Sequence, residues 1–173
     1  MDRDVFKTRL LLQEGNDGKK YWDFCNFQGE WCMAFVSYAM LVLANIDDFP
    51  KEISCTSAKK KLQHLINHSY DTAEIGDIIY FELNNNTADG VEHVGIVVDN
   101  SNGKITLIEG NTNGKDFKHT TVNVFEYPVT CSSFDCIIDM SSYFQDSIPE
   151  NLKDEIKFLQ DKIARIREIV NEE

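Results

Sequence analysis

Residues 32–44 read CMAFVSYAMLVLA, and this stretch decides the fold. It is apolar on nearly every side, contains neither Gly nor Pro, and is followed by a polar break at residues 45–50. A helix without a polar stripe is buried inside a domain. The stretch is also well short of the ~20 apolar residues that a membrane-spanning helix needs. It therefore predicts the central helix of a globular domain and no membrane span.

Helical patterns lie on both sides of this stretch. Residues 2–13 predict a short helix that a Gly- and Asn-containing turn ends. Residues 56–68 predict an amphipathic helix with Leu62, Leu65 and Ile66 on one side. The N-terminal half of the chain is therefore expected to be helical.

Strand patterns begin after Gly76. Five segments there are rich in β-branched and aromatic residues, namely 78–83, 93–98, 104–109, 121–127 and 134–139. The segments that join them are rich in Asn, Asp and Gly, as turns require. Helices followed by a run of strands predict an α+β fold. We expect an antiparallel sheet of about five or six strands packed on the helix at 32–44.

The C-terminal residues follow a different pattern. Their apolar residues recur at spacings of 4, 3, 4, 3 and 4, at Leu152, Ile156, Leu159, Ile163, Ile166 and Val170. β-branched residues at position a and Leu at d are typical of parallel coiled-coil dimers. We expect a domain at 1–145, a helix at 146–173, and homo-oligomerisation through residues 150–170. The alternative is that this helix packs on its own domain.

The charge of the chain excludes some partners. Its 173 residues carry 17 basic and 29 acidic side chains, a net charge of −12. Nucleic-acid binders need basic residues to displace phosphate counterions, so neither nucleic acid nor an anionic membrane surface is expected as a partner. The first residues, MDRDVFKTRLLLQEG, do not form a secretory signal. Either the protein stays cytoplasmic, or it leaves by another route, or a signal is missing from this chain.

One of the five cysteines stands out by its position. Cys32 begins the predicted buried helix, where unsatisfied backbone N–H groups favour the thiolate, which is the nucleophilic form. The alternative is that Cys32 is simply a small buried hydrophobic residue. Cys131 and Cys136 form no CxxC motif and have no His-rich surroundings, so a zinc site is not expected.

Among the four histidines, His93 is the best candidate for a general base. It opens the predicted strand at 93–98, and a strand end near the start of a helix can hold a base beside a thiol. His64 and His68 are spaced like metal ligands but lack a third ligand nearby, so we expect them at the surface. His119 lies in a polar loop and is expected to be exposed. The alternative for His93 is a purely structural hydrogen bond.

A third polar group ends the next strand. If the loop at 101–103 has three residues, His93 lies opposite Asn111 and Glu109 projects from the same face. A two-residue Asn102-Gly103 turn would point Glu109 and Asn111 to the other face, unless a bulge restores the register. On the correct face, Glu109 or Asn111 can orient the imidazole, as the third member of a Cys-His site does.

These segments together resemble the CHAP family, the cysteine- and histidine-dependent amidohydrolases and peptidases of bacterial and phage cell-wall enzymes. The resemblance runs from about residue 6 to 143. The segments that carry it are GEWCMAFVSYAM (29–40), FPKEISCTSAKKKLQ (49–63), GDIIYFELNNNTADGVEHVGIVV (76–98) and ITLIEGNTNG (105–114). The resemblance implies a papain-like fold, with Cys32 as nucleophile, His93 as base, Glu109 as its orienting group and Asn111 as a further polar member.

The resemblance also implies the substrate. The family cuts amide bonds of peptidoglycan, either between muramic acid and L-alanine or within the stem peptide and its cross-bridge, so we expect a cell-wall hydrolase. A phage lysin would explain the missing signal. The alternatives are an interbacterial effector amidase of similar fold, and a catalytically silent CHAP-like scaffold assembled through the C-terminal helix.

Residues around the expected nucleophile suggest how substrate is held. Gln28 is a candidate to donate a hydrogen bond to the oxyanion, and Trp31 and Tyr80 are candidates to line the cleft. The alternatives are that Gln28 is a solvent-exposed loop residue and that the two aromatic residues belong to the core. No cofactor is expected. A calcium site in the 84–89 loop is not expected either, because the loop has a single carboxylate and calcium prefers several carboxylate oxygens.

Overall fold

The computed structural model describes residues 1–83 and 90–144. The 84–89 loop lies outside the described residues. So do the predicted helix at 146–173 and the oligomerisation through 150–170, which stay predictions together with the division into two domains.

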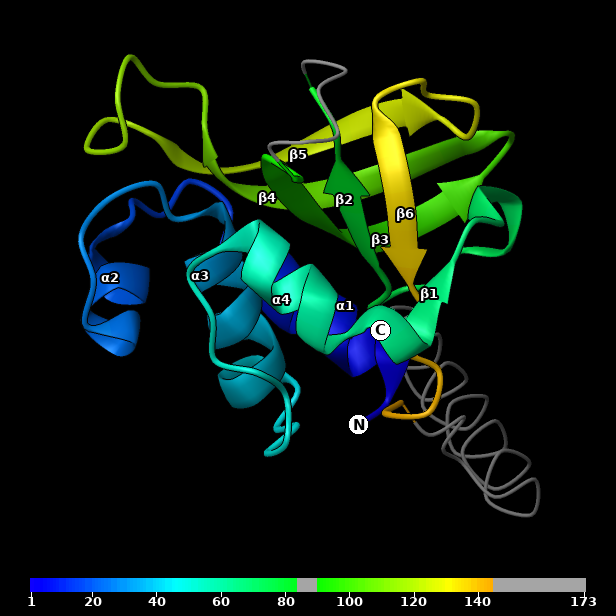
Figure 1. Cartoon of the computed structure of the whole chain (residues 1–173), viewed down its shortest axis with the longest axis horizontal. Coiled ribbons are helices and arrows are strands. Elements are labelled where there is room, and N and C mark those ends of the chain that lie inside the picture. The colour runs from blue at the N-terminus through cyan, green and yellow to red at the C-terminus, as the bar shows by residue number, and fades with distance from the viewer. Residues whose placement is uncertain (84–89, 145–173) are drawn as a thin grey trace, which may run out of the picture.

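The helices gather on one side of the sheet (Figure 1). They are α1 (Arg3–Leu11), α2 (Lys19–Cys25), α3 (Cys32–Tyr38) and α4 (Cys55–Lys61), with short 3₁₀ turns at Gln63–Leu65 and Tyr70–Thr72. The Asp2 side chain caps α1 by accepting from two backbone N–H groups, and the Ser54 side chain caps α4 by accepting from the backbone N–H of Ser57. α3 continues into a π-helical turn at Ala39–Leu43, so the helical segment predicted at 32–44 is present.

The helix predicted at 56–68 is shorter than expected. α4 ends at Lys61, and the chain then forms the strand β1 (Ile66–Asn67). Ile66 and Asn67 pair with Ile138 and Ile137 of the last strand. Backbone pairing with a distant strand therefore overrides the helical pattern of the local sequence.

The strands form a single antiparallel sheet in the order β1-β6-β2-β3-β4-β5. Their bounds are β2 (Ile78–Phe81), β3 (His93–Ser101), β4 (Lys104–Thr112), β5 (Thr121–Pro128) and β6 (Phe134–Ile138). The five strands predicted after Gly76 are all present. Helices on one face of an antiparallel sheet confirm the predicted α+β fold.

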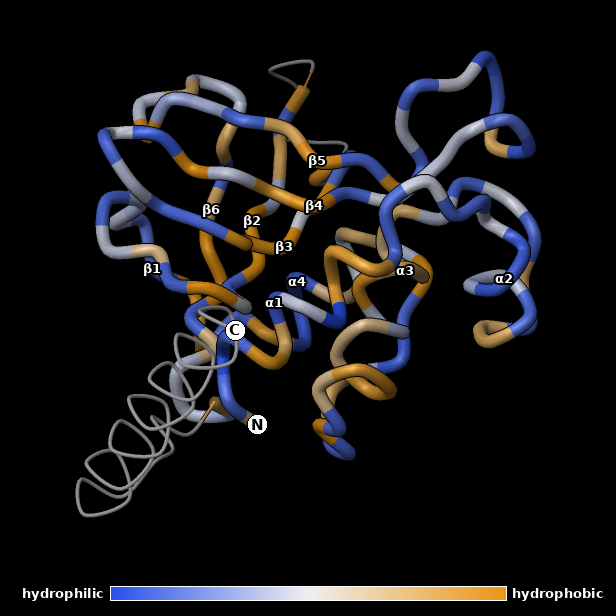
Figure 2. The backbone as a smooth tube through the Cα atoms, turned by 180° about the vertical axis from the view of Figure 1, so that it is seen from behind, coloured by the Kyte–Doolittle hydropathy of each residue, from blue (hydrophilic) through white to orange (hydrophobic). Residues whose placement is uncertain are grey.

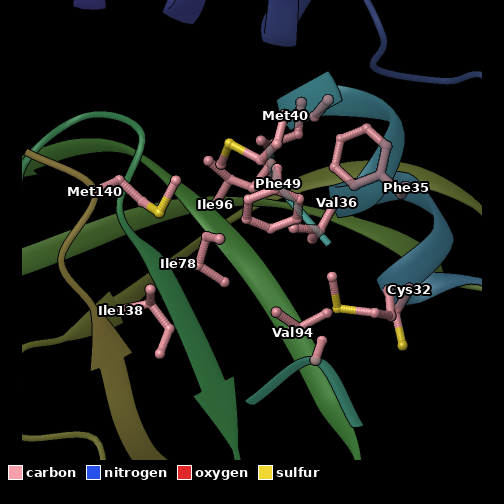
Figure 3. Close-up of a cluster of buried hydrophobic side chains, with 14 of the residues drawn as sticks. Cys32, Phe35, Val36, Met40, Phe49, Ile78, Val94, Ile96, Ile138 and Met140 are labelled. Atoms are coloured by element: carbon pink, nitrogen blue, oxygen red, sulfur yellow. The ribbon is translucent and has the colours of Figure 1, made fainter. Parts of the chain in front are cut away.

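The sheet buries apolar side chains on both faces because strand residues alternate between them. Val94, Ile96 and Ile108 belong to the core formed with α3, which Figure 3 shows in close-up. Val97 and Leu107, their neighbours in sequence, belong to a second cluster on the other face. Figure 2 shows the hydrophobic residues concentrated in α3 and the central strands, and hydrophilic ones in the loop between β4 and β5.

No helix in the described part of the chain is long and apolar enough to span a membrane.

Candidate active site

Cys32 is the first residue of α3 and lies at the edge of the main core (Figure 3). The residue is only 6% exposed. All five cysteines are free thiols. Because Cys32 is not in a disulfide, its sulfur is available as a nucleophile at the start of a buried helix.

The pairing of β3 with β4 contains a bulge, which a two-residue turn needs if His93 and Glu109 are to share one face of the sheet. Asn102 and Gly103 form a two-residue turn with φ values of 54° and 74°. The pairing shifts by one residue between Val97 and Asp99, so β3 carries one extra residue there. Continued toward the start of β3, the shifted register places His93 opposite Asn111. Without this bulge, Glu109 would point to the other face of the sheet.

His93 and Glu109 form a close and buried pair. His93 Nε2 lies 2.7 Å from Glu109 Oε2, and because an ionised carboxylate can only accept, the Nε2–H group donates. The two side chains are 16% and 2% exposed. The Phe81 ring, 5.5 Å from the imidazole ring, adds an apolar wall. This pairing leaves Nδ1 as the ring nitrogen through which His93 can act on Cys32, whose pKa it lowers.

Gly95 makes room for the Glu109 side chain. A Cβ atom at residue 95 would lie 2.8 Å from Glu109 Cγ and 3.2 Å from Leu107 Cβ. Both distances are shorter than ordinary carbon contacts, so the bare backbone of Gly95 lets the carboxylate stay beside His93.

A second thiol, whose position was not expected from the sequence, lies next to Cys32. Cys55, the first residue of α4, places its Sγ 3.5 Å from Cys32 Sγ. The Cys55 thiol contributes most to lowering the pKa of Cys32, burial opposes this effect, and His93 lowers the pKa further. The hydrogen bond between the two thiols raises the pKa of Cys55 well above the ordinary value. Of the two thiols, Cys32 is therefore the one whose thiolate form is favoured. No spacing in the sequence indicated this contact.

The imidazole of His93 is held in the charged form. Burial by itself would lower the pKa of His93, but the neighbouring Cys32 thiol and the hydrogen-bonded Glu109 carboxylate raise it overall. The two shifts together favour a thiolate at Cys32 and an imidazolium at His93, which is the reactive form of a Cys-His site.

Asn111 lies close to this pair in the register but uses its side chain elsewhere. It has a positive φ of 65°. Its Nδ2 donates to Glu30 Oε2, and its Oδ1 accepts from Thr120 Oγ1 at 2.8 Å. Asn111 therefore ties the loop before α3 to the end of β4, and Glu109 is the residue that contacts His93.

Trp31 and Tyr80, expected to line the cleft, are fully buried. Trp31 stacks on Tyr21 at 5.2 Å and donates its Nε1–H to Thr120 Oγ1 at 2.9 Å. The Tyr80 hydroxyl lies 3.6 Å from Met33 Sδ in the core. A ring without exposed surface offers nothing to a substrate, so we assign both residues to the core instead.

Gln28 lies in the exposed loop between α2 and α3. Its neighbours around a surface hollow include Trp22, Asp23 and Phe27. The loop leads directly into the start of α3, four residues before Cys32. Its role in holding the oxyanion stays a prediction.

The remaining histidines lie apart from this site. His64, His68 and His119 are exposed. His119 pairs with Asp116 across 2.8 Å on the surface. Within residues 1–83 and 90–144, no group of three or more His, Cys, Asp or Glu side chains is arranged to hold a metal ion.

Comparison with known proteins places the chain in a family. The family model described as the CHAP domain matches residues 23–111, which is more than half of the chain and includes Cys32, His93, Glu109 and Asn111. The chain therefore belongs to the CHAP domain family.

A solved structure shares the fold. A wild-type endolysin, LysIME-EF1, superposes with a TM-score of 0.51 over 80% of this chain, at 11% sequence identity. The match covers 64% of the endolysin, so this chain corresponds to less than two thirds of that protein. A search of the curated proteins found no significant match.

Proposed function

We propose that this protein is a peptidoglycan hydrolase that cleaves an amide bond with Cys32 as its nucleophile. The observation that carries the proposal is the arrangement of Cys32, His93 and Glu109, in which His93 hydrogen-bonds the Glu109 carboxylate at 2.7 Å and lowers the pKa of the Cys32 thiol. Membership of the CHAP domain family and the fold shared with an endolysin support a cell-wall substrate.

The reaction follows from the roles of these side chains. The Cys32 thiolate attacks the carbonyl carbon of the amide, and the imidazolium of His93 gives its Nδ1 proton to the leaving amine. Water, deprotonated by His93, then hydrolyses the thioester. Glu109 keeps the ring oriented and stabilises its positive charge throughout. The substrate is either the bond between muramic acid and L-alanine or a bond of the stem peptide or cross-bridge.

The tetrahedral intermediate needs hydrogen-bond donors for its oxyanion. The backbone N–H of Cys32 is one donor, because the first N–H groups of a helix have no intrahelical partner. Gln28 is the proposed second donor, since its loop leads directly into α3. Replacing Gln28 by Glu removes the donor with little change in volume and is expected to lower kcat by about 10²-fold.

The direct test is zymography on purified bacterial cell walls. Wild-type protein should clear the walls, while Cys32→Ala should lose on the order of 10³-fold or more of the activity. Cys25→Ala is the matched control, because Cys25 is a half-buried thiol at the end of α2 outside the site. Clearing by Cys32→Ala at the wild-type rate would contradict the proposal.

Mass spectrometry of the released fragments would identify the bond. A new amino group on L-alanine together with a free lactyl carboxylate indicates an amidase. New termini inside the stem peptide or cross-bridge indicate an endopeptidase. A well-folded wild-type protein that releases no fragments from walls of several chemotypes would favour the scaffold function instead.

A further inference from the structure

The contact between Cys32 and Cys55 has chemistry that amide hydrolysis does not use. Both residues are 6% exposed and free, and their sulfur atoms are 3.5 Å apart. A disulfide has an S–S distance of about 2.05 Å, so the two atoms need to approach by about 1.5 Å. The two thiols belong to different helices and are 23 residues apart, so they are not neighbours merely through sequence.

We propose that Cys32 and Cys55 form a redox modification site, in which a small peroxide oxidises Cys32 and Cys55 then closes a reversible disulfide. Cys55 is the resolving thiol in this reaction. The disulfide removes the nucleophile and protects it from further oxidation. The inference rests on two thiols and an oxidant, and it does not depend on the identity of the proposed substrate.

The first step is the attack of the Cys32 thiolate on one oxygen of hydrogen peroxide. A sulfur–oxygen bond forms, the oxygen–oxygen bond breaks, and hydroxide leaves and takes a proton from the His93 imidazolium to become water. The sulfur loses two electrons and becomes a sulfenic acid, while the peroxide is reduced. A thiolate is the reactive form for this step.

The second step is the attack of Cys55 on the sulfenic sulfur. The sulfur–sulfur bond forms, the sulfur–oxygen bond breaks, and the hydroxyl group leaves with the Cys55 proton as water. The hydrogen bond with Cys32, burial and the charge of Cys32 together raise the pKa of Cys55, and the charge is absent once Cys32 is a neutral sulfenic acid. Oxidation of the first thiol thus makes the second one a better nucleophile. No further oxidant is needed for this step.

The geometry also favours Cys55 over other resolving groups. Cys25, Cys131 and Cys136 are free thiols as well, but the sulfur–sulfur contact of Cys32 in the described structure is with Cys55. The disulfide is therefore expected between Cys32 and Cys55 within one chain.

The test uses the reduced full-length chain treated with hydrogen peroxide, then alkylated, digested and analysed by mass spectrometry. Wild-type protein should give a peptide pair linked through Cys32 and Cys55, and dithiothreitol should restore both thiols. In Cys55→Ser, which keeps a hydroxyl donor but cannot form a disulfide, Cys32 should progress to sulfinic acid. The fraction of Cys32 recovered by dithiothreitol should fall at least tenfold. Cys25→Ser, the matched control, should behave like the wild type.

Two results would overturn the inference. One is equal accumulation of Cys32 sulfinic acid in the wild type and in Cys55→Ser. The other is a wild-type disulfide that links Cys32 to a different cysteine or to a second chain. If Cys55→Ser does not fold, as circular dichroism would reveal, the linked peptides of the wild type alone decide the outcome. Because the readout is the state of the thiols, an inactive protein in the wall assay leaves this test intact.

Discussion

Two histidine–carboxylate pairs in this molecule have nearly the same geometry and opposite surroundings. His93 and Glu109 are 2.7 Å apart, and their side chains are 16% and 2% exposed. His119 and Asp116 are 2.8 Å apart, and their side chains are 70% and 52% exposed. Distance alone does not distinguish a candidate catalytic pair from a surface pair.

The difference lies in what surrounds each pair. The His93 pair lies against the Phe81 ring and near the Cys32 thiol. Away from water, the charges of Cys32 and Glu109 act strongly on His93 and raise its pKa. The Asp116 carboxylate accepts from the backbone N–H of Lys118 and from His119, which together lower its pKa, but water surrounds the pair. Water and salt screen exposed charges. Burial and the neighbouring thiol are therefore the features on which we base the proposed catalytic role of the His93 pair.

The strongest way to break this comparison is to remove each histidine. His93→Ala should lower kcat for wall clearing by about 10³- to 10⁴-fold, because the general acid–base group is lost. His119→Ala should leave kcat within twofold of the wild type. Steady-state turbidity assays on purified walls measure both variants. Equal losses in the two variants would show that the buried pair has no special role.

Removing the charge of each carboxylate should have a smaller effect. Glu109→Gln keeps the volume but removes the group that stabilises the imidazolium, and should lower kcat by about 10²-fold. Asp116→Asn should have no measurable effect on kcat. KM is measured as well, because loss of a group that orients His93 should lower kcat and leave KM unchanged. A Glu109→Gln variant with only a raised KM would instead assign Glu109 to substrate binding.

Much of this arrangement could be predicted from the sequence, because local chemistry determines it. The apolar stretch at 32–44 and the β-branched segments after Gly76 predicted the helix, the strands and their α+β arrangement. The strand alternation also showed that His93 and Glu109 could share a face only with an odd loop or a bulge. The structure has the bulge, between Val97 and Asp99.

The remaining features depend on packing between distant segments. The contact of Cys55 with Cys32 follows from how α4 packs near the start of α3, and no sequence spacing encodes it. Tyr80 looked suitable for a cleft because aromatic residues bind substrates, yet the fold buries it completely. The end of α4 at Lys61 reflects pairing of Ile66 with β6, which a local helical pattern cannot anticipate.

The comparison can be sharpened by measuring the reactivity of Cys32 against pH. An ordinary thiol loses its reactive thiolate as the pH falls below about 8.5. Cys55 and His93 lower the pKa of Cys32, so its thiolate should persist at neutral and mildly acidic pH and disappear only below that lowered pKa.

In Glu109→Gln, the imidazolium is less stable and the pKa of Cys32 should rise. At a pH below the pKa of Cys32 in both the wild type and the variant, alkylation by iodoacetamide should slow about tenfold for each unit by which the pKa rises. Peptide mapping reports the rate at Cys32 alone. An unchanged pH profile in Glu109→Gln would mean that the carboxylate does not act on the thiol through His93, and Asp116→Asn provides the matched profile.

The smallest expected effect is a loss of folding stability when a side chain is added at Gly95, beside the buried His93–Glu109 pair. In Gly95→Ala, the new methyl group would overlap Glu109 Cγ at 2.8 Å and press on Leu107. Overpacking of this kind costs about 1–3 kcal/mol, which urea unfolding can measure. Ser101→Ala, at the exposed end of the same strand, should change stability by less than about 0.5 kcal/mol. If Gly95→Ala unfolds at the wild-type urea concentration, the sheet accommodates a side chain there, and some other feature must hold Glu109 beside His93.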